Sequence, residues 1–205
     1  MRASGCNLRC WFCDTPYASW DPVGEDLSVE EILQQVEELA CSHVVLTGGE
    51  PLLFAEMIPL CNGLRQRECH ITIETAGTLY LPLKCDLMSI SPKMSNSTPS
   101  QSRSPKWHLR HQQTRHVPEV IERLISEAPY QIKFVIASPA DCVEVERYLQ
   151  EFPAIDSERV LLMPQATDEE TSTQISAWLE PYCQENGRKF CPRMQIQWFG
   201  LVRGT

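Results

Sequence analysis

Apolar and polar positions along the chain follow two different periods. From Val29 onward the apolar residues recur at helical spacing, and Ser28 to Glu31 matches a capping box, so a helix is expected there. The run HVVLT is short, β-branched and followed by two glycines, which is typical of a buried strand that enters a loop. Repetition of these patterns predicts helices over 28–40, 55–67, 117–127, 141–150 and 168–180, the last ending near Pro181, and strands over 43–47, 70–75, 86–91, 131–137, 159–164 and 193–199.

Strands that alternate with helices predict one α/β domain over 1–205, with right-handed crossovers and a parallel sheet covered by helices. The segment 91–116 departs from this pattern, since it is rich in Ser, Pro, Gln, His and Arg, and we expect a long loop there with a mobile tip. The carboxyl ends of parallel strands share one edge of the sheet, so motifs that follow strands should converge there as a candidate active site. These motifs are TGGEP at 47–51, ETAGT at 74–78, SPK at 91–93 and MPQAT at 163–167.

Charge and cysteine content narrow the class of function. The formal net charge of -9 argues against a nucleic-acid or anionic-membrane binder, because such partners call for a basic surface, and favours a small-molecule substrate. Ten cysteines in 205 residues are too few for a disulfide scaffold, and neither a leader sequence nor a long apolar run is visible. We therefore expect a cytoplasmic protein whose closely spaced cysteines serve metal or redox chemistry, while scattered ones such as Cys41, Cys61 and Cys142 pack in the core.

Cys6, Cys10 and Cys13 form a C-x3-C-x2-C motif that lacks a fourth cysteine nearby. One interpretation is a zinc site completed by a distant residue, but such sites usually contain a second C-x2-C pair or paired histidines. The other is an iron–sulfur cluster, which normally takes four thiolates. Three thiolates would leave one iron of a cubane open for a substrate or cofactor.

With Phe12 directly before its last cysteine, this motif resembles that of the radical S-adenosylmethionine (SAM) superfamily. The resemblance implies a [4Fe-4S] cluster whose open iron is chelated by the amino and carboxyl groups of SAM, and whose reduction cleaves SAM to a 5′-deoxyadenosyl radical. It also implies that TGGEP holds the SAM amino group. The residues suit this role, because glycines allow backbone carbonyls to approach an ammonium closely and Glu50 adds negative charge.

A more specific resemblance is to the 7-carboxy-7-deazaguanine synthase family within that superfamily. The segments GCNLRCWFCDT, TGGEPLL, ETAGT, SPK, LMPQ and PRMQIQWFGLVRGT occur in this order and cover nearly the whole chain. The resemblance implies a lyase that converts 6-carboxy-5,6,7,8-tetrahydropterin to 7-carboxy-7-deazaguanine and releases ammonia, for queuosine and other deazapurines. The radical would abstract a hydrogen atom from C6 of the pterin.

The same resemblance assigns roles to individual residues. The hydroxyl of Thr15 would bind Mg²⁺, a hard cation that can bridge to the substrate carboxylate; without the resemblance, Thr15 would simply end a loop before Pro16. The glutamate of ETAGT would lie near the SAM ribose or the pterin, or else be a strand-end carboxylate in water. The implied substrate contacts are Arg2, Thr47, Glu74 and Thr205, and the implied SAM contacts are Phe12, Asp14, Gly48, Gly49, Glu50, Ser91, Pro92, Lys93 and Gln165. The histidines, His43, His70, His108, His111 and His116, have no place in the family pattern and are expected to be structural or on the surface.

The fold implied by the resemblance is a partial, open (β/α) barrel that is smaller than a six-strand, six-helix core. Only five residues precede Cys6, so we expect either a natural start upstream of Met1 or a fold that lacks its first strand. The resemblance also implies a homodimer and an external electron donor such as flavodoxin, with neither nucleic acid nor membrane as a partner.

Three other functions remain open at this point, one enzymatic and two not. A radical SAM activase, which generates a glycyl radical on another protein, shares the short core but would not predict the CDT, SPK and MPQ motifs. A plain electron carrier should have four thiolates for each cluster. An inactive iron–sulfur binding module would bind a pterin without forming product.

Overall fold

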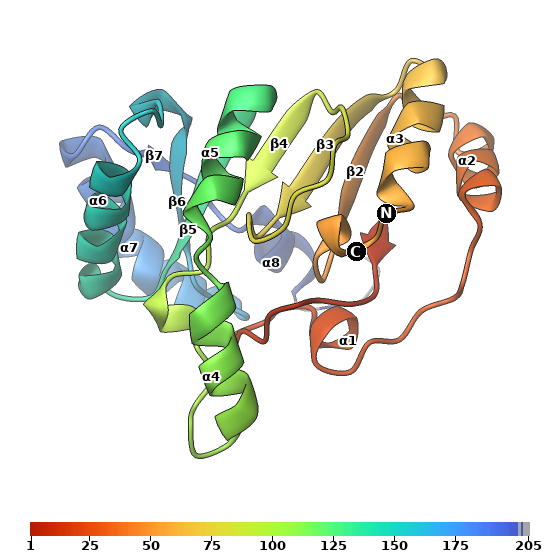
Figure 1. Cartoon of the computed structure of the whole chain (residues 1–205). Coiled ribbons are helices and arrows are strands. Elements are labelled where there is room, and N and C mark those ends of the chain that lie inside the picture. Colours follow the sequence, from red (N-terminus) through yellow and green to blue (C-terminus); the bar gives the residue numbers. More distant parts are fainter. Residues whose placement is uncertain (201, 203–205) are drawn as a thin grey trace.

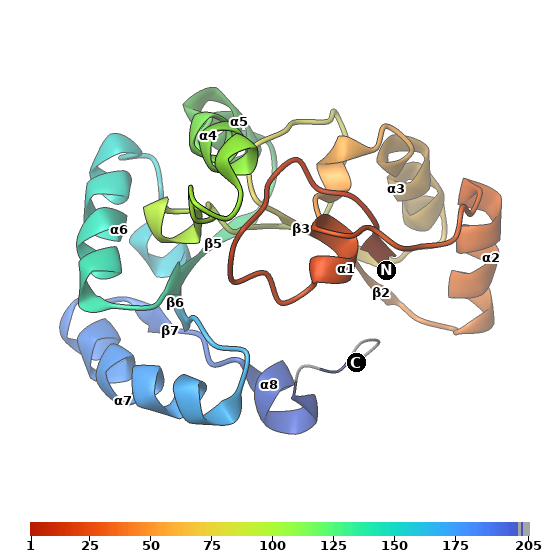
Figure 2. The ribbon, with the colours of Figure 1, turned by 90° about the horizontal axis from the view of Figure 1, so that it is seen from below.

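Seven parallel strands form one curved sheet in the computed structural model, which describes residues 1–200 and 202. The strands lie in the order in which they occur along the chain, and the sheet curves around a central space without closing (Figures 1 and 2). They are β1 (Arg2–Ala3), β2 (His43–Gly48), β3 (His70–Thr75), β4 (Leu87–Ile90), β5 (Tyr130–Ile136), β6 (Val160–Pro164) and β7 (Lys189–Phe190). The predicted α/β class and open barrel are confirmed.

Helices cover the outer, convex side of this sheet, and others gather where the strands end (Figure 2). The outer helices are α2 (Val29–Glu38), α3 (Met57–Gln66), α5 (Pro118–Glu127), α6 (Pro139–Glu151) and α7 (Glu169–Glu185). The shorter elements are α1 (Pro16–Ser19), α4 (Pro105–Thr114), α8 (Met194–Phe199), and the 3-10 turns η1 (Pro51–Leu53), η2 (Ser95–Ser97) and η3 (Ser157–Arg159). None of the helices in the described part of the chain is long and apolar enough to cross a membrane.

Side-chain alternation along the strands separates the core from the central space. On β5, Ile132, Phe134 and Ile136 are fully buried toward the outer helices, while the residues between them are only half-buried. Lys133 is one of these half-buried residues, and it lines the central space. Because successive side chains of a strand point to opposite faces, the sheet has an apolar outer face and a partly polar inner face. The inner face supplies the wall of the candidate site.

Three predicted elements differ from those observed. The segment 91–116 is not a loop throughout, because it contains η2 and the whole of α4; α4 is polar on most sides and therefore shows no apolar period. The strand expected over 193–199 is instead α8, which begins at Met194, since alternation over so few residues cannot distinguish a strand from a helix. The helix expected to end near Pro181 continues to Glu185, because the buried Leu179 and Cys183 hold its last turns against the core.

Of the two alternatives expected for the N-terminus, a fold without its first strand is wrong, and a natural start upstream of Met1 stays a prediction. Arg2 and Ala3 pair in parallel with Thr47 and Gly48 of β2. The terminal ammonium donates to the Val45 carbonyl at 2.8 Å, which extends the pairing to the first residue. The sheet is therefore not reduced in strand number, although β1 has only two residues.

Candidate functional site

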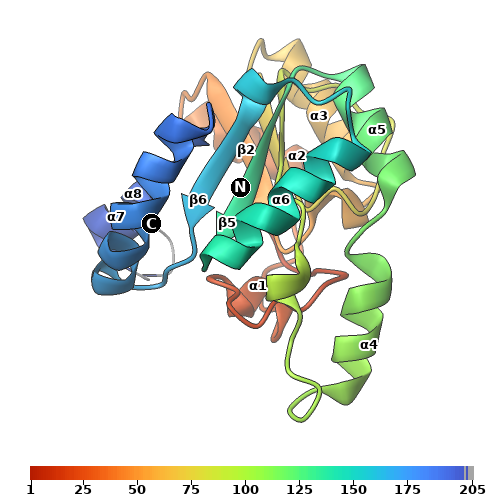
Figure 3. The ribbon, with the colours of Figure 1, turned by 90° about the vertical axis from the view of Figure 1, so that its left-hand side faces the viewer.

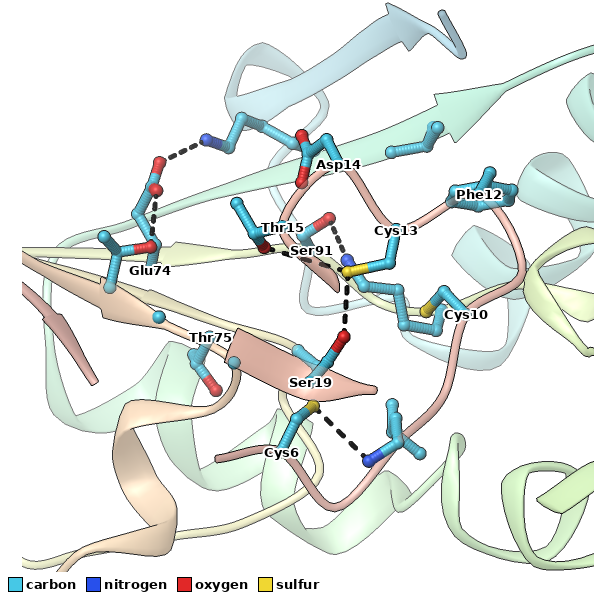
Figure 4. Close-up of a pocket in the computed structure, with 18 of the residues that line it drawn as sticks. Cys6, Cys10, Phe12, Cys13, Asp14, Thr15, Ser19, Glu74, Thr75 and Ser91 are labelled. Carbon is cyan, nitrogen blue, oxygen red and sulfur yellow. Dashed lines mark hydrogen bonds and ion pairs between the residues drawn. The ribbon is translucent and has the colours of Figure 1, made fainter. Parts of the chain in front are cut away.

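A cavity of about 230 Å³ opens inside the curved sheet at the carboxyl ends of its strands (Figure 4). This volume is far larger than the roughly 10–15 Å³ that a single water needs, so the cavity can accept a small molecule. Most of the residues assigned to the site line it, namely Arg2, Cys6, Cys10, Phe12, Cys13, Asp14, Thr15, Thr47, Gly48, Gly49, Glu74, Ser91 and Lys93. The convergence expected at the strand ends is therefore observed.

The three cysteines lie on the loop between β1 and α1, and Figure 4 shows their sulfur atoms directed toward one common space. Cys6 Sγ accepts a hydrogen bond from the Leu8 amide at 3.4 Å, and Cys13 Sγ lies 3.2 Å from Ser19 Oγ. Burial raises the pKa of Cys10 to about 12 and also raises the pKa of Cys6. Unliganded thiols at these positions are thus protonated at neutral pH, and binding of a cation must displace their protons.

Gly48 and Gly49 allow the cysteine loop to pack directly on the end of β2. A Cβ atom on Gly49 would lie 2.1 Å from the Gly5 carbonyl oxygen and 2.4 Å from that of Ala18. Gly48 has a φ of +146°, and a Cβ there would meet the backbone of Ala3 at 2.3 Å. The two glycines are therefore required for backbone contact with β1 and α1, in addition to lining the cavity.

Glu50 is fully buried and lies outside the set of cavity-lining residues. Its carboxylate accepts hydrogen bonds from Thr75 Oγ1 at 2.8 Å, from the Ala76 amide at 2.8 Å and from the Leu52 amide at 3.1 Å. These bonds tie the end of β2 to the end of β3. Burial nevertheless raises the pKa of Glu50, and the hydrogen bonds and Lys93 oppose that rise. This placement favours a role in positioning the glycine loop.

The SPK motif contributes a cation to the cavity. Lys93 Nζ donates to Ser91 Oγ at 2.8 Å, and its charge acts to lower the pKa values of both Cys6 and Cys10 against the larger effect of burial. A cation beside the thiols favours their anionic form. The other two assigned SAM contacts, Pro92 and Gln165, do not line the cavity, and their roles stay predictions.

A charged network crosses the inner face of the sheet. Lys133 Nζ lies 2.8 Å from Glu74 Oε1, and Thr47 Oγ1 donates to Glu74 Oε2 at 3.0 Å. Burial acts to raise the pKa of Glu74, but the charge and hydrogen bond of Lys133, with the Thr47 bond, lower it overall. Arg2 adds a further cation near this carboxylate. Glu74 is thus held as an anion in a cavity wall with two cations beside it.

Thr15 occupies the position before α1, but its side chain makes no capping hydrogen bond. Its hydroxyl forms a hydrogen bond of 3.7 Å with Cys13 Sγ, and Thr15 is among the residues that line the cavity, so this oxygen lies beside a thiol of the site. The neighbouring Asp14 forms an ion pair with Arg193, the residue before α8, and this pair joins the cysteine loop to the C-terminal helix. The assigned substrate contact Thr205 lies outside the described residues.

The arrangement of thiols agrees better with a cluster than with a single ion. Among residues 1–200 and 202, no three His, Cys, Asp or Glu side chains gather as they would around one metal ion, so these residues offer no four-residue zinc site. Thiols that each bind a different iron need not approach one another so closely. Three thiols on one cavity wall, with a lysine beside them, fit a cluster that keeps one iron open.

Several cavity-lining residues had been given no individual role from the sequence, although some of them lie within the motifs. Lys133, Met163 and Val135 lie on inner-face positions of β5 and β6, where strand alternation could have indicated them once Thr47 and Glu74 were placed. Arg193 and Gln195 were expected on a strand, whereas Arg193 lies directly before α8 and Gln195 lies in it. The full set of additional lining residues is Leu8, Ser19, Thr75, Ala76, Ser89, Lys133, Val135, Met163, Arg193 and Gln195.

Most of the other cysteines and histidines occupy the expected positions. Cys61, Cys69, Cys85, Cys142 and Cys183 are buried, which confirms a packing role for Cys61 and Cys142. The expectation is wrong for Cys41, which is exposed. Among the histidines, His111 is fully buried on α4 and hydrogen-bonded on both ring nitrogens, and the other four are exposed or half-buried.

Comparison with known proteins agrees with this geometry. The sequence model of the radical SAM superfamily matches residues 2–122. A 7-carboxy-7-deazaguanine synthase of Rhodopirellula baltica is 44% identical to the entire chain, which covers 80% of that relative, and one of Halobacterium salinarum is 36% identical over 96% of the chain and 80% of the relative.

Two solved structures share the fold. QueE from Escherichia coli superimposes with a TM-score of 0.65 at 18% identity, covering 92% of this chain and 82% of that one. Streptococcus suis SuiB bound to S-adenosylmethionine gives 0.60 at 14% identity, covering 96% and 51%. The chain therefore belongs to the radical SAM superfamily, which implies a [4Fe-4S] cluster and SAM, and within it to the 7-carboxy-7-deazaguanine synthase family.

Proposed function

We propose that this chain converts 6-carboxy-5,6,7,8-tetrahydropterin to 7-carboxy-7-deazaguanine with release of ammonia, in the biosynthesis of queuosine or another deazapurine. The observation that carries the proposal is the 44% identity to a synthase of that name along the whole chain. The polar groups on the inner face of the sheet agree with it, because they lie in the same cavity as the three thiols. Since only ammonia is lost, the conversion needs no net oxidant.

Cys6, Cys10 and Cys13 would hold the cluster, and Gly48, Gly49, Ser91 and Lys93 would surround SAM. When bound, these cofactors supply one-electron chemistry that begins with abstraction of a hydrogen atom from C6 of the substrate. Phe12 and Leu8 contribute apolar surface to the cavity beside the thiols. Their contribution is to exclude water from the site at which the radical reaction occurs.

The substrate would lie between the thiols and the charged network of the inner face. Arg2 offers a guanidinium, which suits bidentate binding of the substrate carboxylate. Glu74 is an anionic acceptor for the N–H groups of the pterin ring, while Thr47 and Lys133 fix its orientation. The proposed contact of Thr205 with the substrate rests on the family resemblance alone.

We further propose that Thr15 binds Mg²⁺ through its hydroxyl. Support comes from the position of this oxygen on the cavity wall and from the absence of a capping hydrogen bond to it. Hard cations of this kind bind oxygen ligands and usually retain several waters.

The Thr15→Val variant should therefore assemble the cluster normally but lose most of the stimulation of product formation by Mg²⁺. Thr15→Ser keeps the hydroxyl and should retain that stimulation. A magnesium titration of product formation for the three proteins checks this role, and an unchanged response of Thr15→Val would refute it.

An acidic electron-transfer protein such as flavodoxin would reduce the cluster. In a chain of net charge -9, residues 87–118 contain five cationic residues and no acidic residue. This basic segment includes α4, which Figure 2 shows beside the cysteine loop. The exposed Trp11 belongs to that loop and offers an apolar contact near the thiols. Charge complementarity of this kind raises association rates with an acidic partner.

Charge reversal of Arg103 and Lys106 should slow turnover driven by a flavodoxin and leave dithionite-driven turnover unchanged. Both side chains are exposed; Lys106 is the second residue of α4, and Arg103 lies two residues before the helix. Lys84→Glu, an equally exposed change just before β4, should affect neither reaction. Equal loss with both reductants would contradict a docking role for this segment.

Homodimerisation and a cytoplasmic location are also part of the proposal. The C-terminal helix exposes Trp198 and Phe199, which supports a role for α8 in self-association. Sedimentation of the purified protein tests this point, and a monomer at micromolar concentration would contradict it.

The experiment that tests the proposed activity is anaerobic reconstitution followed by incubation with the carboxy-tetrahydropterin, SAM, Mg²⁺ and a reductant. Mass spectrometry should detect 7-carboxy-7-deazaguanine. Cys10→Ala should assemble no cluster and form no product. Substantial product from that variant, or none from the intact protein with a full cluster, would overturn the proposal.

A further inference from the structure

His111 is a fully buried histidine that touches the cysteine loop from α4. Its Nδ1 accepts a hydrogen bond at 3.2 Å from the backbone amide of Arg9, the residue directly before Cys10. Its Nε2 lies 2.8 Å from Ser97 Oγ in η2. Figure 3 shows α4 below α5, at the same end of the sheet as the loop that carries α1. The His111 side chain thus joins α4 to the cysteine loop, and the two bonded residues are 102 positions apart in sequence.

The hydrogen-bond pattern fixes the state of this ring. Ser97 Oγ donates its proton to the Met94 carbonyl at 2.7 Å, so it can only accept from His111. Nε2 therefore carries the hydrogen and Nδ1 is the acceptor for the Arg9 amide, which leaves the imidazole neutral. Replacement by an apolar side chain would leave a buried backbone N–H without an acceptor.

Further contacts bind the same loop to the same segment. The Arg9 guanidinium lies 4.1 Å from the centre of the Trp107 ring on α4, and its Nη1 donates to the Cys6 carbonyl at 2.7 Å. The Trp11 amide donates to the Ser97 carbonyl at 3.2 Å. Both neighbours of Cys10 in sequence are thus held by η2 and α4.

We propose that residues 94–114, which contain η2 and α4, act as a clamp that holds the cluster-binding loop, and that His111 is its central positioning residue. The clamp fixes the backbone on both sides of Cys10, so that the thiol faces the cavity before a cluster is assembled. It also limits fluctuations of the loop that would expose a bound cluster to oxygen or chelators. The proposal rests on the cluster implied by superfamily membership and is independent of the pterin substrate.

The test compares His111→Leu with His111→Asn and His108→Leu. Leucine fills the site without an acceptor, whereas the asparagine carboxamide oxygen can still accept the hydrogen bond from the Arg9 amide. His108 lies on the same helix but bonds to the Pro99 carbonyl, away from the cysteine loop, and its variant serves as the matched control. Backbone hydrogen exchange over residues 6–13 is measured on the cluster-free proteins. The loss of cluster absorbance in the presence of a chelator is then measured after reconstitution.

His111→Leu should exchange faster over residues 6–13 and lose its cluster about tenfold faster than the unaltered protein, near the lower end of effects seen for residues that orient metal ligands. His111→Asn and His108→Leu should remain close to the unaltered protein in both measurements. The proposal is overturned if His111→Leu behaves like His108→Leu, or if a folded His111→Asn is as impaired as the leucine variant. Should His111→Leu fail to fold, Trp107→Leu replaces it, with the same expectations. Since neither measurement uses the pterin, their outcome is separate from that of the proposed activity.

Discussion

At the residue scale, the ion pair of Lys133 and Glu74 keeps an anion inside the cavity. Burial alone would raise the pKa of Glu74, but Lys133 and the hydrogen bond from Thr47 lower it. The carboxylate therefore stays ionised to a lower pH than an ordinary glutamate, and its negative charge is lost only as the pH falls through the lowered pKa. A substrate that places N–H groups against Glu74 meets a charged acceptor at neutral pH.

Lys133→Met should therefore raise the pKa of Glu74 and shift the acidic limb of the kcat/KM profile to higher pH. Loss of the pair should also reduce kcat/KM at neutral pH by about tenfold, the equivalent of about 1.4 kcal/mol. Lys189→Met removes a different lysine, whose pair with Glu158 lies on the surface, and should change neither quantity. An unshifted acidic limb in Lys133→Met would contradict the role of this ion pair.

At the element scale, the glycine loop and the clamp determine where the thiols lie. The motif TGGEP was predicted to contact SAM, and its glycines do line the cavity. What the sequence could not indicate is that β1 and α1 also pack on the loop, because that contact joins segments far apart in the chain. Helix α4 could not be predicted from the polar composition of 91–116 for a similar reason. The contacts that stabilise α4 are with the cysteine loop rather than with an apolar core.

Gly49→Ala should displace the cysteine loop, because its Cβ would collide with two backbone carbonyls. We expect a loss of about 1–3 kcal/mol in unfolding free energy and a marked drop in iron bound per chain after reconstitution. Gly187→Ala is the control, since its Cβ would meet nothing within 4 Å although its φ is +62°. That variant should lose about 1 kcal/mol and bind a full complement of iron. Normal iron content in Gly49→Ala would contradict the packing argument.

The burial of His111 predicts a dependence of stability on pH. Desolvation, with Arg115, Lys93 and His108 nearby, lowers the pKa of His111 to about 4, whereas the unfolded residue titrates near about 6.5. The unfolded chain therefore binds more protons between these values, so stability is complete above about pH 6.5 and falls as the pH drops toward 4.

This contribution should amount to about 3 kcal/mol and be absent from His111→Asn. Denaturant unfolding of the cluster-free proteins between pH 4.5 and 7 measures it. Parallel pH profiles for the unaltered protein and His111→Asn would contradict the assignment.

At the scale of the whole molecule, the fold and the family could be predicted from local patterns, while the cavity wall could not be completed from them. Strand–helix alternation predicted a parallel α/β sheet with its site at the carboxyl ends of the strands, and the family resemblance implied an open barrel; both are observed. The short β1 was not predicted because a strand of two residues is too short to show an alternation of apolar and polar side chains. Lys133 belongs to no motif, and Arg193 lies in a segment that was expected to be a strand; the curvature of the sheet and the position of α8 bring the two residues to the cavity.

The measurement that tests the central claim most directly is transfer of deuterium from the C6 position of 6-carboxy-5,6,7,8-tetrahydropterin into 5′-deoxyadenosine. The reconstituted protein is incubated with the deuterated substrate, SAM, Mg²⁺ and reductant, and both nucleoside and product are analysed by mass spectrometry. Our account predicts deuterium in 5′-deoxyadenosine and the accumulation of 7-carboxy-7-deazaguanine. Cleavage of SAM without deuterium transfer, and without that product, would contradict it.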